Sequence, residues 1–272
     1  MTGDLNLEYR PTDENMVYGK ATRGWKPGYI NGDTVNTDCT AGPVFKNPAE
    51  EEVVYAFEFG SKNRFFDNSA QVNLTAFYNR YLNLQVLSQF QNTGFVSNAQ
   101  QARTWGIEFE GLWQPTFAEN LSLSVIYGYL NAKYVQYEGG YDFAISLDGQ
   151  NFSGNTMVRA PEHTATLAAE YLWNLKSGFG NLIPRIEYTV SSEIYFSASN
   201  RPETLEPWFG KLQVRMRWES DDGDLFVEGF GENLTDVDVR STRSVGSSLL
   251  GYPVYGAYEP PRTWGVRVGG SY

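Results

Sequence analysis

Apolar and polar residues alternate with a period of two along most of the chain. In residues 69–90, one side of the pattern is apolar and contains Ala70, Val72, Leu74, Ala76, Tyr78, Leu82, Leu84 and Val86. Serine, threonine, asparagine and glutamine dominate the other side, and Phe77, Arg80 and Tyr81 interrupt the alternation. Because successive side chains of a strand point to opposite faces, this run predicts a strand with one apolar and one hydrated face.

Similar runs predict an all-β chain of about eleven strands with no α-helix. The predicted strands span residues 4–10, 15–24, 52–65, 69–90, 93–114, 119–137, 162–175, 181–197, 206–219, 224–233 and 262–272. Short connections (11–15, 66–68, 115–119, 176–180 and 220–223) alternate with long ones (25–51, 138–161, 198–205 and 234–261). The tight turn near 91–92 is the exception, and its long flanking strands are expected to project. Short turns at one end and long loops at the other are typical of an outer-membrane barrel.

Strand length and aromatic placement favour a transmembrane antiparallel β-barrel over a soluble fold. The predicted strands 69–90 and 93–114 far exceed the roughly 5–6 residues that are usual in sandwiches. Aromatic residues lie toward strand ends on the apolar side, as they do at the two interfaces of a membrane barrel. These residues are Tyr127, Tyr129, Tyr171, Trp173, Tyr188 and Trp218. A soluble carbohydrate-binding β-sandwich, which also alternates, stays the alternative.

Composition and charge exclude several classes of function. The net charge of −11 opposes binding to nucleic acid. Cys39 and His163 are single residues of their types, so an internal disulfide is impossible and a histidine-based metal site is not expected. No segment approaches the roughly 18 apolar residues of a membrane helix, and the first residues lack a secretory signal. An odd strand number is unusual for a bacterial barrel, so we expect residues 1–272 to be the C-terminal part of a longer protein.

Five segments resemble TonB-dependent outer-membrane receptors. The first, residues 5–31, contains a Pro-Thr-Asp-Glu turn followed by Val-Tyr-Gly. Residues 50–86 carry a Glu-x-Gly-x-Lys signature, and residues 96–111 carry Asn-Ala, Ala-Arg and Gly-x-Glu-x-Glu. GENLTD (231–236) and PRTWGVRVGGSY (261–272) complete the set. Together the segments cover nearly the whole chain in the order found in that family.

The resemblance implies a barrel of about 22 strands that is plugged by an N-terminal domain. It implies energy-coupled uptake of a scarce nutrient such as a ferric siderophore, cobalamin or a saccharide, without a cofactor. The implied partners are outer-membrane lipid, the barrel-insertion machinery, the TonB energy-coupling complex and a small-molecule ligand. We expect the chain to lack the plug and the first half of the barrel, and to end in the periplasm of a Gram-negative cell. A structural outer-membrane barrel without transport is a further alternative.

Charged residues on the polar sides of the strands are expected to line the lumen, because barrel interiors are polar. They are Glu108, Glu110, Glu170, Arg185, Glu187, Lys211, Arg215, Arg217 and Arg267. Glu108 and Glu110 lie two positions apart and share a face, which is compatible with acid–base catalysis. Contact with a plug or with arginines of neighbouring strands explains them better, and the chain is therefore not expected to be an enzyme.

Aromatic residues in the long loops are the predicted ligand contacts, although packing between loops explains them equally well. They are Trp25, Tyr29, Tyr141, Tyr252, Tyr255 and Tyr258. Asp142, Asp148 and Asn151 share one loop, but their spacing does not match a calcium-binding EF-hand. His163 is expected at the rim of the barrel. Cys39 is either unpaired or bonded outside this chain.

The chain ends within a strand pattern. Trp264, Val266, Val268 and Tyr272 share one side of this pattern, and Arg267 lies on the other. The alternation predicts a closing strand rather than a frayed tail. The resemblance implies that the aromatic end is recognised by the machinery that inserts barrels.

Overall fold

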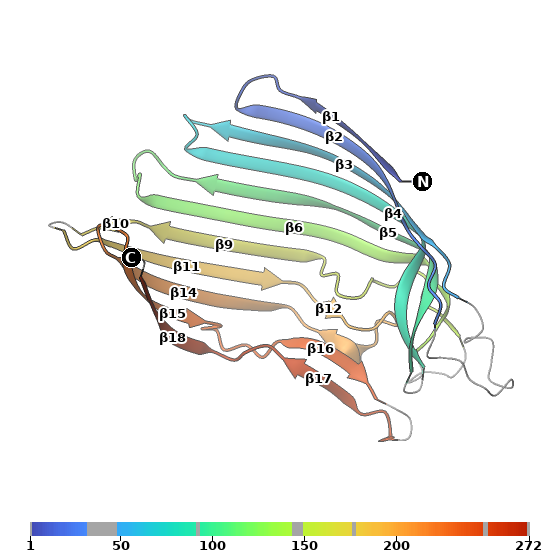
Figure 1. Cartoon of the computed structure of the whole chain (residues 1–272). Helices are drawn as coiled ribbons and strands as arrows, with labels where there is room; N and C mark the ends of the chain where they lie inside the picture. The colour runs from blue at the N-terminus through green and yellow to red at the C-terminus, as the bar shows by residue number, and fades with distance from the viewer. Residues whose placement is uncertain are drawn as a thin grey trace.

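The fold is one large antiparallel sheet. The computed structural model describes residues 2–31, 48–90, 93–142, 149–175, 178–246 and 250–270. Eleven strands pair in chain order, and the short β10 (Trp173–Asn174) adds to β11. The eleven are β1 (Gly3–Tyr9), β2 (Asn15–Lys26), β3 (Glu52–Phe65), β4 (Ala70–Phe90), β5 (Thr93–Trp113), β6 (Leu121–Gln136), β9 (His163–Tyr171), β11 (Asn181–Ser191), β14 (Phe209–Glu219), β15 (Leu225–Glu232) and β18 (Thr263–Gly270). The sheet is curved and open, with β1 and β18 at its two edges (Figure 1).

This arrangement confirms the predicted all-β fold and the order of the strands. The short connections gather at one end of the sheet, here called the turn end, and the long connections gather at the other, here called the loop end (Figure 1). β4 and β5 have 21 residues each and pair from Ala70–Trp113 to Phe90–Thr93. The pairing of β3 with β4 stops at Val53–Leu82, so the β4–β5 hairpin projects beyond β3 as predicted.

Three small hairpins at the loop end were not predicted. They pair β7 (Glu138–Gly140) with β8 (Gln150–Asn151), β12 (Ile194–Tyr195) with β13 (Leu205–Glu206), and β16 (Arg240–Val245) with β17 (Val254–Tyr258). The single predicted strand 181–197 is wrong at its end, because β11 stops at Ser191 and β12 belongs to another sheet. Among the described residues, the one helical element is the 3-10 turn η3 (Pro202–Thr204), and no helix is long and apolar enough to cross a membrane.

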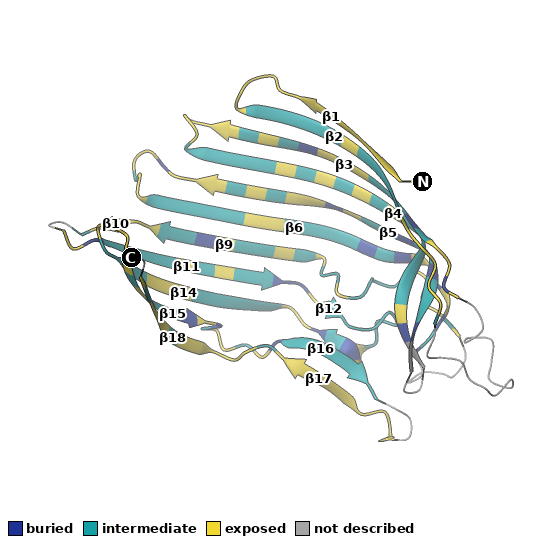
Figure 2. Ribbon diagram, in the orientation of Figure 1, coloured by how far each residue is buried: buried dark blue, intermediate teal, exposed yellow. Residues whose placement is uncertain are grey.

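The two faces of the sheet are opposite in chemistry, and the apolar one is exposed. On β4, Leu74 is 47% and Tyr78 40% exposed, whereas Thr75 and Phe77, on the opposite face, are less exposed (Figure 2). On β5, Trp105 and Ile107 continue the same exposed wall. We call this wall the apolar face and the opposite one the polar face. A water-soluble protein would bury such a wall, so its exposure indicates that this face lies in an apolar environment.

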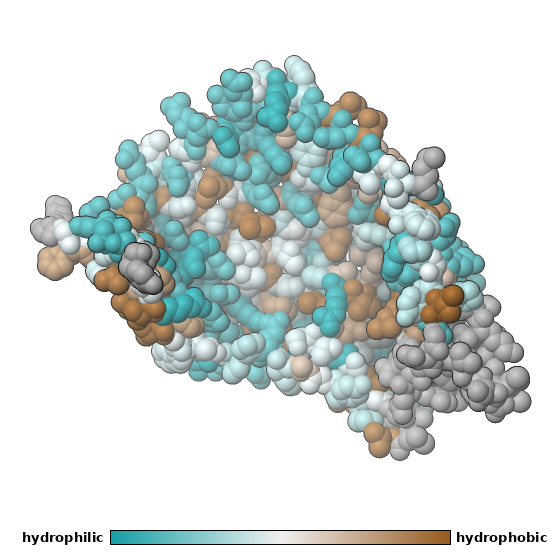
Figure 3. All heavy atoms as spheres, in the orientation of Figure 1, coloured by the Kyte–Doolittle hydropathy of each residue, from teal (hydrophilic) through white to brown (hydrophobic). Residues whose placement is uncertain are grey.

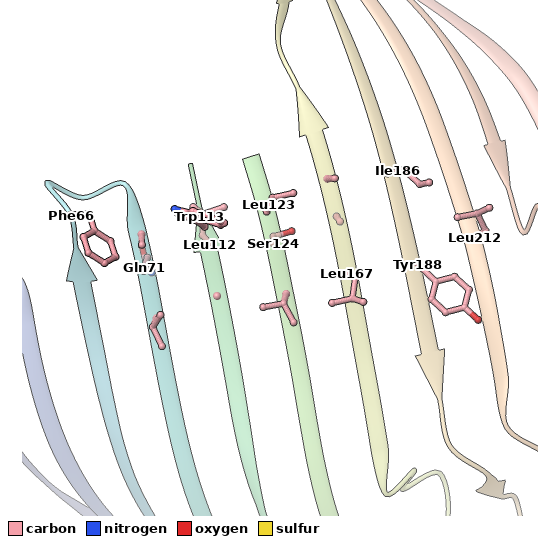
Figure 4. A pocket seen from close by; sticks show the side chains of 16 residues that line it. Phe66, Gln71, Leu112, Trp113, Leu123, Ser124, Leu167, Ile186, Tyr188 and Leu212 are labelled. Carbon is pink, nitrogen blue, oxygen red and sulfur yellow. The ribbon is translucent and has the colours of Figure 1, made fainter. Parts of the chain in front are cut away.

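The apolar face also contains a depression lined by apolar side chains. It has a volume of about 720 Å³ and opens near the turn end, across β4, β5, β6, β9, β11 and β14 (Figure 4). Its walls include Trp113, Leu123, Leu167, Ile186 and Leu212. Hydrophilic residues, in contrast, spread over much of the surface shown in Figure 3.

Leu84 and Val86, the last residues of the predicted apolar side of β4, lie on the opposite face from the one predicted. Asn83 adopts a left-handed conformation with φ of 53°, which asparagine tolerates better than most residues. Beyond it, Leu84 and Val86 pack against a buried cluster, together with Tyr81 from the opposite side of the pattern. At Asn83 the backbone therefore exchanges the faces to which odd- and even-numbered side chains point. The strict period of two predicts the face correctly only up to that residue.

Candidate functional site

A small hydrophobic core lies at the loop end. Its buried members are Ala99 and Ala102 of β5, Tyr134 of β6, and Tyr137 and Phe152 of the following connection. The ring of Tyr137 lies 5.1 Å from that of Tyr134 and meets Phe152 edge-on at 5.4 Å. The backbone N–H of Phe152 donates to the carbonyl of Tyr137 at 2.8 Å. These contacts hold the long β6–β9 connection against the strands.

The β11–β14 connection is joined to this core through asparagine side chains. Asn200 donates to the carbonyl of Thr156 at 2.9 Å and accepts from the N–H of Thr156 at 2.6 Å. Asn155 donates to the carbonyl of Ala198 at 2.9 Å. Each asparagine amide forms hydrogen bonds with backbone groups that a neighbouring strand would otherwise form. Two connections that are far apart in sequence are therefore held together as one layer at the loop end.

Asp142 forms a polar centre within this layer. Its carboxylate, 9% exposed, accepts hydrogen bonds from the hydroxyls of Ser197 and Ser199. Arg201 lies 3.7 Å away, and it also pairs with Glu203 at 3.3 Å. A hydrogen bond from its own backbone and the Arg201 side chain hold the pKa of Glu203 below its usual range.

A buried ion pair joins the β15–β18 connection to the same layer. Glu206 is 2% exposed, and Arg240 donates to its carboxylate at 3.0 Å. This hydrogen bond raises the pKa of the Arg240 guanidinium. Arg243, three residues further along β16, donates to the carbonyl of Leu205 at 2.9 Å. Three long connections thereby meet over one region of the sheet.

The connections enclose a cavity of about 530 Å³, here called the loop-end cavity. Ring-bearing and polar side chains line it, and they include Tyr137, Tyr141, Arg159, Phe196 and Arg243. The Arg159 guanidinium stacks on Phe196 at 5.2 Å. Neither Arg159 nor Arg243 has a carboxylate of a described residue within salt-bridge distance, so both keep positive charge available to the cavity. An aromatic wall with two such cations suits a planar, anionic ligand.

Arg159 also has an unusual backbone. Its φ is 57°, in the left-handed region that residues with a Cβ rarely adopt. The backbone N–H of Arg159 donates to the carbonyl of Tyr195 at 2.9 Å, which fixes the residue in this conformation. Such conformations cost free energy and are enriched at binding sites.

Of the six predicted ligand contacts, Tyr141 lines the loop-end cavity and the other five lie elsewhere. Trp25 donates to Glu51 at 2.5 Å, and Tyr29 pairs with Ala49 in an isolated bridge. The remaining three, Tyr252, Tyr255 and Tyr258, lie on or beside β17 and are 40–60% exposed. Arg159 and Arg243 were missed by the sequence analysis, although each is a charged residue within a long predicted loop.

The predicted polar-face residues form ion pairs within strands and between them. Arg185 lies 3.6 Å from Glu170 and 2.7 Å from Glu187, and Arg215 lies 3.9 Å from Glu170. Further pairs are Arg217–Glu219 at 3.3 Å, Arg267–Glu228 at 2.9 Å and Lys211–Glu259. Glu110 accepts from Asn73 at 3.1 Å, and neither it nor Glu108 forms a salt bridge with a described residue. These partners indicate a structural role.

Among the described residues, His163 does not belong to a cluster of metal-ligating side chains. His163 accepts or donates a hydrogen bond with the Tyr127 hydroxyl at 2.9 Å and lies 5.9 Å from the ring of Trp208, within an aromatic group on the apolar face. No group of three potential metal-ligating residues occurs in the described part of the chain. Cys39, Asp148 and Tyr272 lie outside the described residues.

Comparison with known proteins finds a matching family and solved structures with a similar fold. The family described as "TonB dependent receptor-like, beta-barrel" matches residues 1–240. The pesticin receptor of Yersinia pestis is 24% identical over 240 residues, which are 88% of this chain and 32% of the receptor. The ferric yersiniabactin uptake receptor FyuA from Yersinia pestis superimposes with a TM-score of 0.75 at 21% identity, over 98% of this chain and 36% of that one. The siderophore receptor PiuA from Acinetobacter baumannii gives 0.73 at 18%, over 100% and 36%. The chain therefore spans about a third of the length of these relatives.

Proposed function

Since the chain belongs to the TonB-dependent receptor β-barrel family of the outer membrane, we propose that it forms the C-terminal part of a receptor for a ferric siderophore or a similar scarce nutrient. In this proposal the rest of the receptor supplies the plug and the other strands of a barrel of about 22 strands. The TonB complex supplies the energy through the N-terminal region. The loop end then faces the outside, the turn end faces the periplasm, and the C-terminus is periplasmic.

The loop-end cavity is the single observation that carries this proposal. A ferric chelate is commonly anionic and presents flat, polarisable groups. Arg159 and Arg243 can donate charge-assisted hydrogen bonds to it, while Tyr141 and Phe196 offer ring contacts. Two guanidinium groups without carboxylate partners bind an anion without first losing an internal salt bridge. We propose that the site binds a ligand and lets it pass.

The polar-face ion pairs fit the same proposal as the lining of the lumen. Arg185, Arg215 and Arg267 each have a carboxylate partner, so these three charges of the interior are paired within the chain. Trp264, Val266 and Val268 are 71–77% exposed on one face of β18, as expected for a lipid-facing closing strand that the insertion machinery recognises. A soluble carbohydrate-binding sandwich would need a second sheet over the apolar face, and the described residues provide none.

Binding and uptake by the full-length receptor test this proposal. Purified receptor would be titrated with ferric chelates of the catecholate, hydroxamate, citrate and phenolate classes, using quenching of tryptophan fluorescence. The class that binds would then be used in a cellular uptake assay with radioactive iron. Each of Arg159→Ala and Arg243→Ala should weaken binding by about 10- to 100-fold, because a hydrogen bond to a charged group contributes about 1.5–3 kcal/mol.

Arg10→Ala is the matched control, because Arg10 is exposed at the turn end and, among the described residues, pairs with Glu8 alone. It should bind and transport as the wild type does. If both cavity variants bind as the wild type does, the loop-end cavity is not the binding site. Failure of the wild-type receptor to take up any of the chelates would favour a structural barrel instead.

A further inference from the structure

Cations form a row across neighbouring strands on the apolar face. Arg80 of β4 lies directly opposite Arg103 of β5, and Arg103 lies directly opposite Lys133 of β6. On the other side of Arg80, the register continues to Tyr55 of β3 and then to Arg23 of β2. β4, β5 and β6 are adjacent in Figure 1. We call Arg80, Arg103 and Lys133 the cationic row.

The register places the cationic row on the lipid-facing side. Arg80 is two residues from Tyr78, and Arg103 is two residues from Trp105, both of which belong to the exposed apolar wall. On β6, the neighbours of Lys133 are Ala132 and Tyr134, which are buried on the opposite face. In a strand, alternate residues share a face. The three cations therefore point away from the lumen.

The height of the row matches the outer boundary of the membrane. From Ala70 at the turn end to Arg80, β4 rises about 33 Å along the strand, or about 25 Å along the axis of a barrel with a 40° tilt. The lipid-facing band of such barrels is about 25 Å tall. Tyr78 and Trp105, directly below the row, are the residue types that mark the interface between hydrocarbon and headgroups. The cationic row thus begins where the hydrocarbon ends.

Among the described residues, none supplies a negative charge that compensates the row. Like charges directly opposite one another destabilise a pair of strands. Neither Arg80 nor Arg103 has a carboxylate of a described residue within 4 Å, whereas Arg185, Arg215 and Arg267 on the polar face all do. Nε of Arg103 is buried without a hydrogen-bond partner in the described structure, and Lys133 donates to Thr156 at 2.8 Å. The cluster is therefore complementary to an anion that comes from outside the chain.

We propose that the cationic row binds the phosphorylated headgroup of a lipid in the outer leaflet. The acyl chains of that lipid would lie against Tyr78, Trp105 and the apolar wall below, and its phosphates would lie between the guanidinium groups and the Lys133 ammonium. A free anion would gain only the charge contacts, whereas a lipid gains the apolar contacts as well. The site is on the opposite face from the proposed lumen and is independent of the nutrient that the receptor carries.

The test measures lipid retention by the full-length receptor in detergent micelles, using native mass spectrometry. The probes are bisphosphorylated lipid A and chemically dephosphorylated lipid A. The variant combines Arg80→Gln, Arg103→Gln and Lys133→Gln. The control combines Lys20→Gln, Lys62→Gln and Arg64→Gln, which removes the same charge from the polar face of β2 and β3. Heat-dependent migration in gels confirms that each protein is folded.

The wild type and the control should retain bisphosphorylated lipid A at least tenfold more than the row variant does. The wild type should also prefer it at least tenfold over dephosphorylated lipid A, and inorganic phosphate should not displace it. Equal retention by the row variant, equal retention of the dephosphorylated lipid, or displacement by inorganic phosphate would each overturn the proposal. If the combined variant does not fold, Arg80→Gln and Arg103→Gln alone, with the wild-type preference between the two lipids, decide the question.

Discussion

Replacing Arg240 with alanine removes the cation that faces the buried carboxylate of Glu206. This pair joins β13 to β16, and through them the β11–β14 and β15–β18 connections. Glu206 is 2% exposed, so water cannot easily take the place of the guanidinium. We expect Arg240→Ala to open the loop-end layer locally while the main sheet stays intact, because the long ladders of the sheet do not depend on this contact.

The expected cost follows from the burial of the acid. Removing one partner of a buried ion pair typically costs about 3–5 kcal/mol, since an uncompensated charge remains. Each 1.4 kcal/mol corresponds to about a tenfold change in an equilibrium constant. Amide protection in β12, β13 and β16 should therefore fall by about 100-fold or more. Glu206→Gln should cost less, about 1–2 kcal/mol, because the amide oxygen still accepts a hydrogen bond from Arg240.

Hydrogen exchange of the full-length receptor, followed by mass spectrometry, measures this change segment by segment. Arg262→Ala is the control, because the Arg262–Asp236 pair at 2.9 Å is 44% and 49% exposed and an exposed pair contributes at most about 1 kcal/mol. If Arg240→Ala changes protection in these segments no more than Arg262→Ala does, the buried pair does not hold the layer. The reasoning from burial would then be refuted.

Three further predictions concern the core, the apolar face and alkaline pH. Phe152→Ala should cost about 3–5 kcal/mol in the loop-end core, which is seen as faster exchange at residues 150–157, because the ring is 4% exposed. Leu74→Arg should destabilise the barrel in lipid vesicles by about 2–4 kcal/mol on urea unfolding, and Thr75→Arg on the polar face by clearly less. Burial raises the pKa of the Tyr137 phenol above its ordinary 10.0. As the pH rises past 10, the unfolded phenol therefore ionises first, and protection of the loop-end core should fall in the wild type but less in Tyr137→Phe.

The strands were predictable because each of them lies between two different media. One side of β4 meets an apolar solvent and the other a polar interior, so the sequence must alternate over the whole length that crosses the band. Turn residues then set the boundaries, which is why β3 and the β4–β5 hairpin begin and end close to the predicted positions. The predicted faces are wrong beyond Asn83, where a left-handed backbone reverses the direction of the side chains. A single asparagine is the one feature of the sequence that marks this reversal.

The loop end could not be predicted in the same way, because its contacts join segments that are far apart in sequence. Asn200 replaces a backbone partner for Thr156, and Glu206 finds its cation 34 residues later in Arg240. No local period encodes such contacts. Tyr141 was among the predicted ligand contacts because an aromatic residue in a long loop is itself informative. Arg159 was not, because its position beside Phe196 and the cavity is visible only in the structure.

The arginines of the two faces differ in their charged partners. This difference distinguishes arginines that stabilise the sheet from arginines that could bind a ligand. On the polar face, the register brings a carboxylate to Arg185 and Arg267, so these cations are satisfied within the chain. On the apolar face, the same kind of register brings Arg103 to Arg80 and Lys133 to Arg103. In the sequence, Arg80 is only an interruption of an apolar alternation. A single cation there indicates proximity to the interface, since a long side chain can extend to the headgroups. Three cations aligned across strands repel one another. No carboxylate of a described residue pairs with them, so we expect an anion from the membrane or the medium to relieve that repulsion.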